Sequence, residues 1–212
     1  MSRIGIIIGT TRDNSAGKVV GEWLYDLAQG RQDGVEYTLL DLKEFDVPLL
    51  TTDVIPATAN KQYADEKVQA WSDAVDACDG FVFVTPEYNR SVPGPFKNAF
   101  DCLAAEWAGK PVAFVGYGPS GAVRAIEAWR PIVVNFSMPQ LRNQVEFYLA
   151  NTTAKAIFAA PMFGAEATEG ARLAGAQAHL VDDAVARVEV AVGRGGLDLH
   201  AAARGEQAAH RP

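Results

Sequence analysis

The stretch Arg3-Ile4-Gly5-Ile6-Ile7-Ile8-Gly9 is an isoleucine-rich run that ends in glycine. A run without alternation between apolar and polar residues is typical of a strand buried on both faces of a parallel sheet. Residues 15–29 follow it, and their large apolar side chains recur at helical spacing: Val19, Val20, Trp23, Leu24 and Leu27. The beginning of the chain therefore predicts a strand, a loop and a helix.

The same alternation continues along the chain. We expect further strands at residues 36–42, 80–85, 111–115 and 144–149, and further helices at residues 59–78, 93–107, 122–136 and 169–192. Strands that alternate with helices give right-handed crossovers and a mostly parallel sheet. The expected fold class is α/β: a flavodoxin-like, doubly wound, five-stranded parallel sheet of order 2-1-3-4-5, with helices on both faces.

The length of 212 residues suits one domain, or one domain with a short appendage. The last stretch, residues 193–212, is rich in Gly, Ala and Arg and has almost no large apolar residue. We therefore expect one flavodoxin-like domain over residues 1–192 and a flexible tail over residues 193–212.

The composition excludes several classes of protein. A chain that is 49% hydrophobic and 21% charged is not disordered over most of its length. Its net charge of −7 repels phosphate backbones and anionic lipids, so we expect neither a nucleic-acid nor a membrane partner. The apolar run near the N-terminus is too short for a signal peptide or a membrane span, and the expected compartment is the cytoplasm.

Cysteine and histidine usage argues against metal and hydrolase chemistry. Cys78 and Cys102 are too few and too far apart for a zinc site or a disulfide framework, and both follow apolar helical patterns. We expect them to be small buried hydrophobes and expect no metal. The three histidines all lie in the last fifth of the chain, which argues against a Ser-His-Asp hydrolase.

Ligands of open parallel sheets bind beyond the carboxyl ends of the strands, so the loops there are the candidate site. The first loop is Gly9-Thr10-Thr11-Arg12-Asp13-Asn14-Ser15-Ala16-Gly17-Lys18. Its hydroxyls, its guanidinium and the amides of a helix N-terminus can form an anion site. A plain N-cap at Ser15 with Arg12 as a surface charge remains the alternative. A P-loop is excluded, because seven residues rather than four separate Gly9 from Gly17.

The second loop, within residues 85–98, reads Thr-Pro-Glu-Tyr-Asn-Arg-Ser-Val-Pro-Gly-Pro-Phe-Lys-Asn. Its three prolines restrict its path and lower the cost of keeping it ordered. It places an aromatic, an amide and a carboxylate over the sheet edge, where a plain connection needs only about two to six residues. A rigid turn with an exposed tyrosine is the alternative interpretation.

The third loop is Gly116-Tyr117-Gly118-Pro119-Ser120-Gly121, which matches the pattern G-x-G-x-x-G. No acidic residue stands about twenty positions later to bind a ribose, so the NAD fingerprint is not supported. The glycines instead let the backbone approach a flat ligand. An anion site, a rigid aromatic loop and a glycine-lined wall together suit a phosphorylated planar cofactor such as FMN.

Three blocks of sequence also carry a family resemblance. They are Gly9-Thr10-Thr11-Arg12 followed by Val20 and Trp23, the block VTPEYNRSVPGPFKNAFD at residues 84–101, and Gly109-Lys110-Pro111 through Tyr117-Gly118 to residues 121–125. From about residue 3 to residue 190 the chain resembles the NADPH-dependent FMN reductase family. That resemblance implies that residues 1–192 form an FMN-binding reductase domain that uses NADPH or NADH.

The resemblance also implies the residues that contact FMN. Those for its phosphate are Thr10, Thr11, Arg12, Ser15 and Gly17. Those along its ribityl chain and ring are Pro86, Glu87, Tyr88, Asn89 and Ser91, and those of the far wall are Tyr117, Gly118, Ser120 and Gly121. No side chain is required as an acid or base, because the chemistry belongs to the flavin N5. Asp13 lies beside the expected phosphate site, so we expect its carboxylate to point away.

The expected function is therefore ping-pong transfer from NAD(P)H through FMN to a small acceptor, such as a quinone, a free flavin or an azo compound. Two alternatives remain: an electron-transfer flavodoxin that does not use NAD(P)H, and a relative that has lost its flavin. Helices bearing Trp71, Trp107 and Trp129 show more apolar surface than one small domain obviously buries. We accordingly expect a homodimer or homotetramer with the FMN edge near the subunit boundary.

Overall fold

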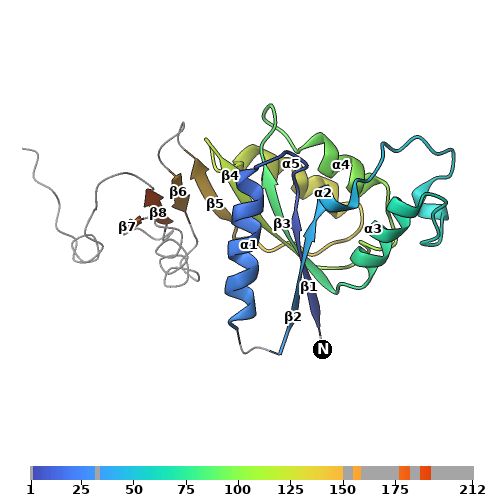
Figure 1. Cartoon of the computed structure of the whole chain (residues 1–212), viewed down its shortest axis with the longest axis horizontal. Coiled ribbons are helices and arrows are strands. Elements are labelled where there is room, and N and C mark those ends of the chain that lie inside the picture. Colours follow the sequence, from blue (N-terminus) through green and yellow to red (C-terminus); the bar gives the residue numbers. More distant parts are fainter. Residues whose placement is uncertain (1, 32–33, 150–154, 159–176, 182–186, 192–212) are drawn as a thin grey trace, which may run out of the picture.

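The computed structural model describes residues 2–31, 34–149, 155–158, 177–181 and 187–191. A six-stranded sheet of order β2-β1-β3-β4-β5-β6 forms its centre (Figure 1). Its strands are β1 (Arg3–Ile8), β2 (Glu36–Asp41), β3 (Gly80–Pro86), β4 (Val112–Gly118), β5 (Val145–Leu149) and β6 (Lys155–Phe158). The first five strands pair in parallel, which confirms the predicted fold class and the order 2-1-3-4-5. The edge strand β6, antiparallel to β5, was not predicted.

Helices cover both faces of this sheet, as predicted. On one face, α1 (Ala16–Gln29) packs through Val20 and Ala28 against apolar residues of β1, β3 and β4. The opposite face carries the larger core and four helices. They are α2 (Leu42–Phe45), α3 (Glu66–Asp76), α4 (Gly94–Asp101) and α5 (Val123–Val134). A short 3₁₀ helix, η1 (Pro56–Thr58), lies between α2 and α3.

Two helices are shorter than the sequence pattern predicted. Instead of spanning residues 59–78, α3 begins after Asp65, whose carboxylate accepts hydrogen bonds from the amides of Lys67 and Val68. Instead of spanning residues 93–107, α4 ends at Asp101, and the chain turns back so that Trp107 enters the core. The start of α3 is thus set by the side-chain cap of Asp65, and α4 ends where the Cys102 amide bonds to the Asn98 and Phe100 carbonyls; apolar spacing alone indicates neither boundary.

The predicted closing helix over residues 169–192 is wrong where the structure describes that span. Residues Gln177–Val181 (β7) and Arg187–Ala191 (β8) form an antiparallel two-stranded sheet. In β8 the sequence Arg-Val-Glu-Val-Ala alternates polar and apolar residues with the period of a strand, and valine favours strands. The rest of that span and the predicted tail at residues 193–212 lie outside the described residues.

The segments bearing the three tryptophans do not present those side chains at the surface, contrary to the prediction. Trp71, Trp107 and Trp129 are fully buried within one subunit, in an aromatic cluster centred on Phe83.

Cys78 and Cys102 are buried as predicted, and burial raises the pKa of each thiol to about 11. Thiols with so high a pKa stay protonated and inert near neutral pH.

Within the described part of the chain, no helix is both long enough and apolar enough to cross a bilayer.

Candidate functional site

The three candidate loops leave the carboxyl ends of β1, β3 and β4, which are adjacent in the sheet. The strand order reverses between β1 and β3, since β2 lies beyond β1 and β4 lies beyond β3. Open α/β sheets bind ligands at such a reversal. The topology therefore brings the predicted loops to one edge of the sheet.

The first loop ends at the N-terminus of α1. Ser15 has extended backbone angles and its hydroxyl accepts a hydrogen bond from the Lys18 amide at 3.3 Å, so it is the N-cap of the helix. The amides of Ala16 and Gly17 occupy the first two helical positions, which have no acceptor within a helix. Arg12 is exposed, and no side chain or backbone oxygen in the described residues pairs with its guanidinium.

Thr10, by contrast, is buried beneath this loop. It is 2% exposed, and its hydroxyl accepts the Arg12 amide at 3.3 Å. Tyr117, the sixth residue of β4, is also buried there, and its burial raises its pKa while Thr10 opposes that shift. A Cβ on Gly17 would lie 2.3 Å from the Tyr117 hydroxyl, so only glycine fits at that position of α1. Tyr117 therefore supports the first loop from below.

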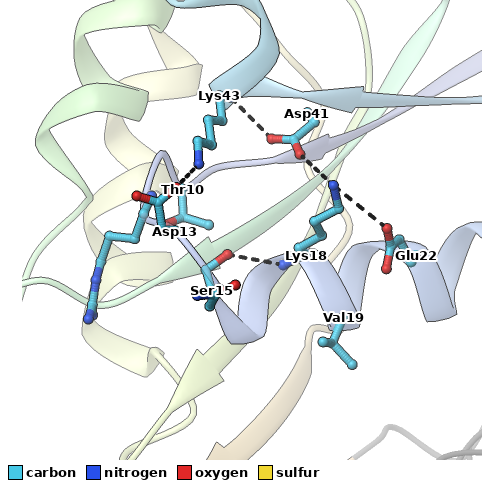
Figure 2. A pocket seen from close by; sticks show the side chains of 10 residues that line it. Thr10, Asp13, Ser15, Lys18, Val19, Glu22, Asp41 and Lys43 are labelled. Atoms are coloured by element: carbon cyan, nitrogen blue, oxygen red, sulfur yellow. Dashed lines mark hydrogen bonds and ion pairs between the residues drawn. The ribbon is translucent and has the colours of Figure 1, made fainter.

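Beside the first loop lies a cavity of about 480 Å³ (Figure 2). Lys18 lies in it between two carboxylates, 3.9 Å from Asp41 and 4.0 Å from Glu22. Asp13 forms an ion pair with Lys43, and the hydrogen bond from the Lys43 ammonium, together with its charge, holds the pKa of Asp13 below its usual value. The negative charge beside the predicted anion site is thus neutralised by a lysine that lies far away in sequence.

The second loop is a tight two-residue turn. The backbone groups of Tyr88 and Ser91 exchange hydrogen bonds at 3.0 and 3.1 Å. Between them, Asn89 and Arg90 have φ of 50° and 69°, the pattern of a type I′ turn. The Tyr88 hydroxyl lies 3.0 Å from the Thr10 hydroxyl, which joins the second loop to the first.

The third loop turns tightly into α5. Gly118 and Gly121 have φ of 146° and 63°, values that favour glycine, and the Gly121 amide bonds to the Gly118 carbonyl at 3.1 Å. Glu87 of the second loop reaches this turn, where its Oε1 lies 3.3 Å from the Ser120 hydroxyl. The three loops are thus joined to one another by side-chain contacts.

The predicted residues divide into three groups by position. Buried in or beneath the loops are Thr10, Gly17, Pro86, Tyr117, Gly118 and Gly121. Exposed at the surface of the loops are Thr11, Arg12, Asn89 and Ser91. The partly buried residues with side-chain partners are Ser15, Glu87, Tyr88 and Ser120.

Three residues that were not among the predicted site residues bond to the loops or to the segment beside them. Lys43 neutralises Asp13 from the segment after β2, and no local pattern indicated this pairing. Arg124, in the first turn of α5, binds Glu87. Asn98 of α4 accepts the Leu50 amide and donates to the Pro48 carbonyl, which fixes the segment after α2 over α4. Asn98 lies within the block at residues 84–101 that carried the family resemblance, and that block was the sequence signal that could have drawn attention to it.

The strand order and the position of the loops are those of flavodoxin-like α/β proteins, which bind FMN at the same reversal of strand order. Comparison with known protein families identifies a particular family within this class. Residues 2–152 match the family model described as NADPH-dependent FMN reductase, and the chain belongs to that family.

Characterised relatives agree with this assignment. The chain is 38% identical over 128 residues to the NAD(P)H-dependent FMN reductase ntnL of Nectria sp, a match that covers 59% of this chain and 64% of that protein. It is 32% identical over 143 residues to a quinone reductase of Pseudomonas putida, covering 64% of this chain and 72% of that protein. The chain spans 64% and 59% of the reductases from Nectria and Schizosaccharomyces pombe, less than two thirds of either.

A solved structure is also similar. FerB, a flavoenzyme NAD(P)H:(acceptor) oxidoreductase from Paracoccus denitrificans, superposes with a TM-score of 0.54 at 29% identity. The superposition covers 66% of this chain and 75% of FerB.

Proposed function

We propose that this protein is an FMN-dependent NAD(P)H oxidoreductase whose second substrate is a small electron acceptor, such as a quinone, a free flavin or an azo compound. The observation that carries the proposal is the convergence of three linked loops at the reversal of strand order, in a chain of the FMN reductase family. FMN, when bound, supplies the redox chemistry between the two substrates.

The donor set of the first loop fits the phosphate of FMN. The first loop offers an exposed guanidinium that has no partner among the described residues, together with hydroxyls and two helix-terminal amides, and these are groups that bind phosphate. We assign the phosphate to Thr10, Thr11, Arg12, Ser15 and Gly17. The role of the buried Thr10 is to shape the loop through its bonds to Arg12 and Tyr88.

The second and third loops would flank the flavin ring and the ribityl chain. The residues of these two loops that we place beside the cofactor are Pro86, Glu87, Tyr88, Asn89, Ser91, Tyr117, Gly118, Ser120 and Gly121. In this proposal the protein orients the cofactor, and its backbone amides stabilise negative charge. No side chain has to donate or accept a proton. Since both substrates would use one open face of the cofactor, we expect ping-pong kinetics.

An anaerobic titration tests the proposed reaction. We expect NADPH to bleach the visible spectrum of the FMN-reconstituted protein, because the cofactor takes up two electrons, and we expect a quinone to restore it. Colour recovery measured at about one quinone per NADPH would establish the two-electron reaction. A bound flavin that neither NADPH nor NADH bleaches would contradict it and favour an electron-transfer flavodoxin. A protein that binds no flavin would exclude both.

We further propose that the protein is a cytoplasmic homodimer or homotetramer, with the FMN edge near the subunit boundary. Its two buried, unpaired cysteines suit a reducing compartment. Four large apolar side chains are exposed in the segment that Asn98 fixes over α4: Leu49, Leu50, Val54 and Ile55. Contiguous exposed apolar residues mark interaction surfaces, and this one adjoins the helix that follows the second loop.

Sedimentation velocity tests this assembly. We expect the wild type to sediment as a dimer or tetramer, and the double variant Leu49→Ser, Ile55→Ser to dissociate at least tenfold more readily, because it removes apolar contact area. Val19→Ser is the control, since Val19 is also an exposed apolar residue but lies on α1. A wild type that sediments as a monomer with and without FMN would refute the proposal.

A further inference from the structure

The carboxylate of Glu87 directs all its described contacts to the start of α5. Its Oε2 accepts a hydrogen bond from the Arg124 backbone amide at 3.0 Å. Its Oε1 lies 3.1 Å from the Arg124 guanidinium and 3.3 Å from the Ser120 hydroxyl. The Glu87 side chain is only 10% exposed, whereas that of Arg124 is 44% exposed. Glu87 is therefore committed to protein contacts rather than free to bind a ligand.

These contacts supply a side-chain hydrogen-bond acceptor that the N-cap residue of α5 lacks. Its N-cap residue, Ala122, has no side-chain oxygen and has left-handed angles, with φ of 58°. A helix start needs acceptors for its first amides, and a carboxylate there also interacts favourably with the helix dipole. Glu87, 35 positions earlier in the chain, provides that acceptor.

The same contacts fix the distance between the second and third loops. Glu87 belongs to the second loop, while Ser120 lies within the glycine turn of the third loop and Arg124 follows that turn, in the first turn of α5. That turn has two glycines with positive φ, so its own backbone restrains it weakly. A link from Glu87 to the turn itself and to the helix that follows it limits how far the loops can separate.

We propose that Glu87 is a positioning residue that caps α5, fixes the spacing of the two loops and offsets the charge of Arg124 beside the cofactor. The inference rests on the proposed function, in which these loops flank the FMN ring. It gives Glu87 and Ser120 a role through the protein rather than through direct contact of their side chains with FMN.

The capping role is tested on the apoprotein. Glu87→Ala removes the acceptor for the Arg124 amide, and we expect its melting temperature to fall by about 2–6 °C. Glu127→Ala is the matched control, because Glu127 lies on the same helix but is exposed, and its ion-pair partner in the described part of the chain is Arg130 on the surface. Equal melting temperatures for the two variants would overturn the capping role, whether or not FMN binds.

The charge role is tested by two variants with opposite expected signs. Glu87→Gln leaves the positive charge of Arg124 uncompensated, so we expect the midpoint potential of bound FMN to rise. Arg124→Gln leaves the negative charge of Glu87 uncompensated, so we expect that potential to fall. We expect the ratio of dissociation constants for reduced and oxidised FMN to change by about fivefold in each direction. Glu127→Gln should leave it unchanged.

Shifts in the same direction, or no shift, would mean that the variants merely loosen the loops and would overturn the charge role. A wild type that binds no FMN would instead refute the proposed function, while the apoprotein measurement would still decide the capping role.

Discussion

Replacing Glu106 with alanine is expected to lower the free energy of unfolding by about 3–5 kcal/mol. The Glu106 side chain is fully buried and accepts three hydrogen bonds, from the Tyr63 hydroxyl at 2.8 Å, the Ser72 hydroxyl at 2.6 Å and the Ala104 amide at 3.0 Å. Alanine would leave these donors without an acceptor where water cannot easily replace it. Burial and the bond to Glu106 also raise the pKa of Tyr63, so its hydroxyl remains a donor across the neutral range.

Urea unfolding followed by tryptophan fluorescence measures this effect, because Trp71 and Trp107 report on the same core. Glu127→Ala serves again as the control, with a loss below about 0.5 kcal/mol, because its ion pair with Arg130 is on the surface. A loss below 1 kcal/mol for Glu106→Ala would show that the three donors find other partners, and that the network does not support the fold.

Arg12→Ala is expected to weaken FMN binding by about ten- to a hundredfold, since a charge-assisted hydrogen bond to phosphate contributes about 1.5–3 kcal/mol. Because the Arg12 guanidinium has no partner in the described part of the protein, its removal breaks no side-chain contact there. The melting temperature of the apoprotein should therefore hardly change. Quenching of FMN fluorescence on titration with apoprotein gives the dissociation constant.

Arg142→Ala is the matched control for this experiment. Arg142 is also exposed, but it follows Gln140, which pairs with Val112 at the amino end of β4, away from the loops. The Arg12 variant should also lose most of the dependence of FMN affinity on salt concentration, whereas the Arg142 variant should keep it. If Arg12→Ala binds FMN as tightly as the wild type, the phosphate does not bind at the first loop.

The central sheet followed from local patterns. Apart from Arg3 and Pro111 at their starts, the runs at residues 3–9, 80–85 and 111–115 contain residues that a doubly covered strand tolerates, and each became a strand of the predicted order. Local patterns misjudged the helix ends, because Asp65 and Glu106 act through hydrogen bonds that spacing does not encode. They also failed at residues 187–191, where strand-like alternation was read as part of an alanine-rich helix.

The candidate site likewise has features that local sequence patterns predicted and features that they did not. Three loops with unusual glycine, proline and hydroxyl content were identified from the sequence, and the sheet brings them together because parallel strands share one carboxyl edge. The partners of their side chains were not identified. Lys43 reaches Asp13 across 30 positions, and Glu87 reaches Arg124 across 37.

Residue order was thus sufficient for the fold class and for choosing the loops of the candidate site, because strand burial and loop composition are properties of neighbouring residues. Only the folded chain assigned the contacts within that site. It buried Tyr117 under the first loop, bonded the Glu87 carboxylate to the Arg124 amide of α5 and left the Arg12 guanidinium without a partner among the described residues. These outcomes depend on distances between segments that are remote in sequence, and such distances exist only once the sheet has formed.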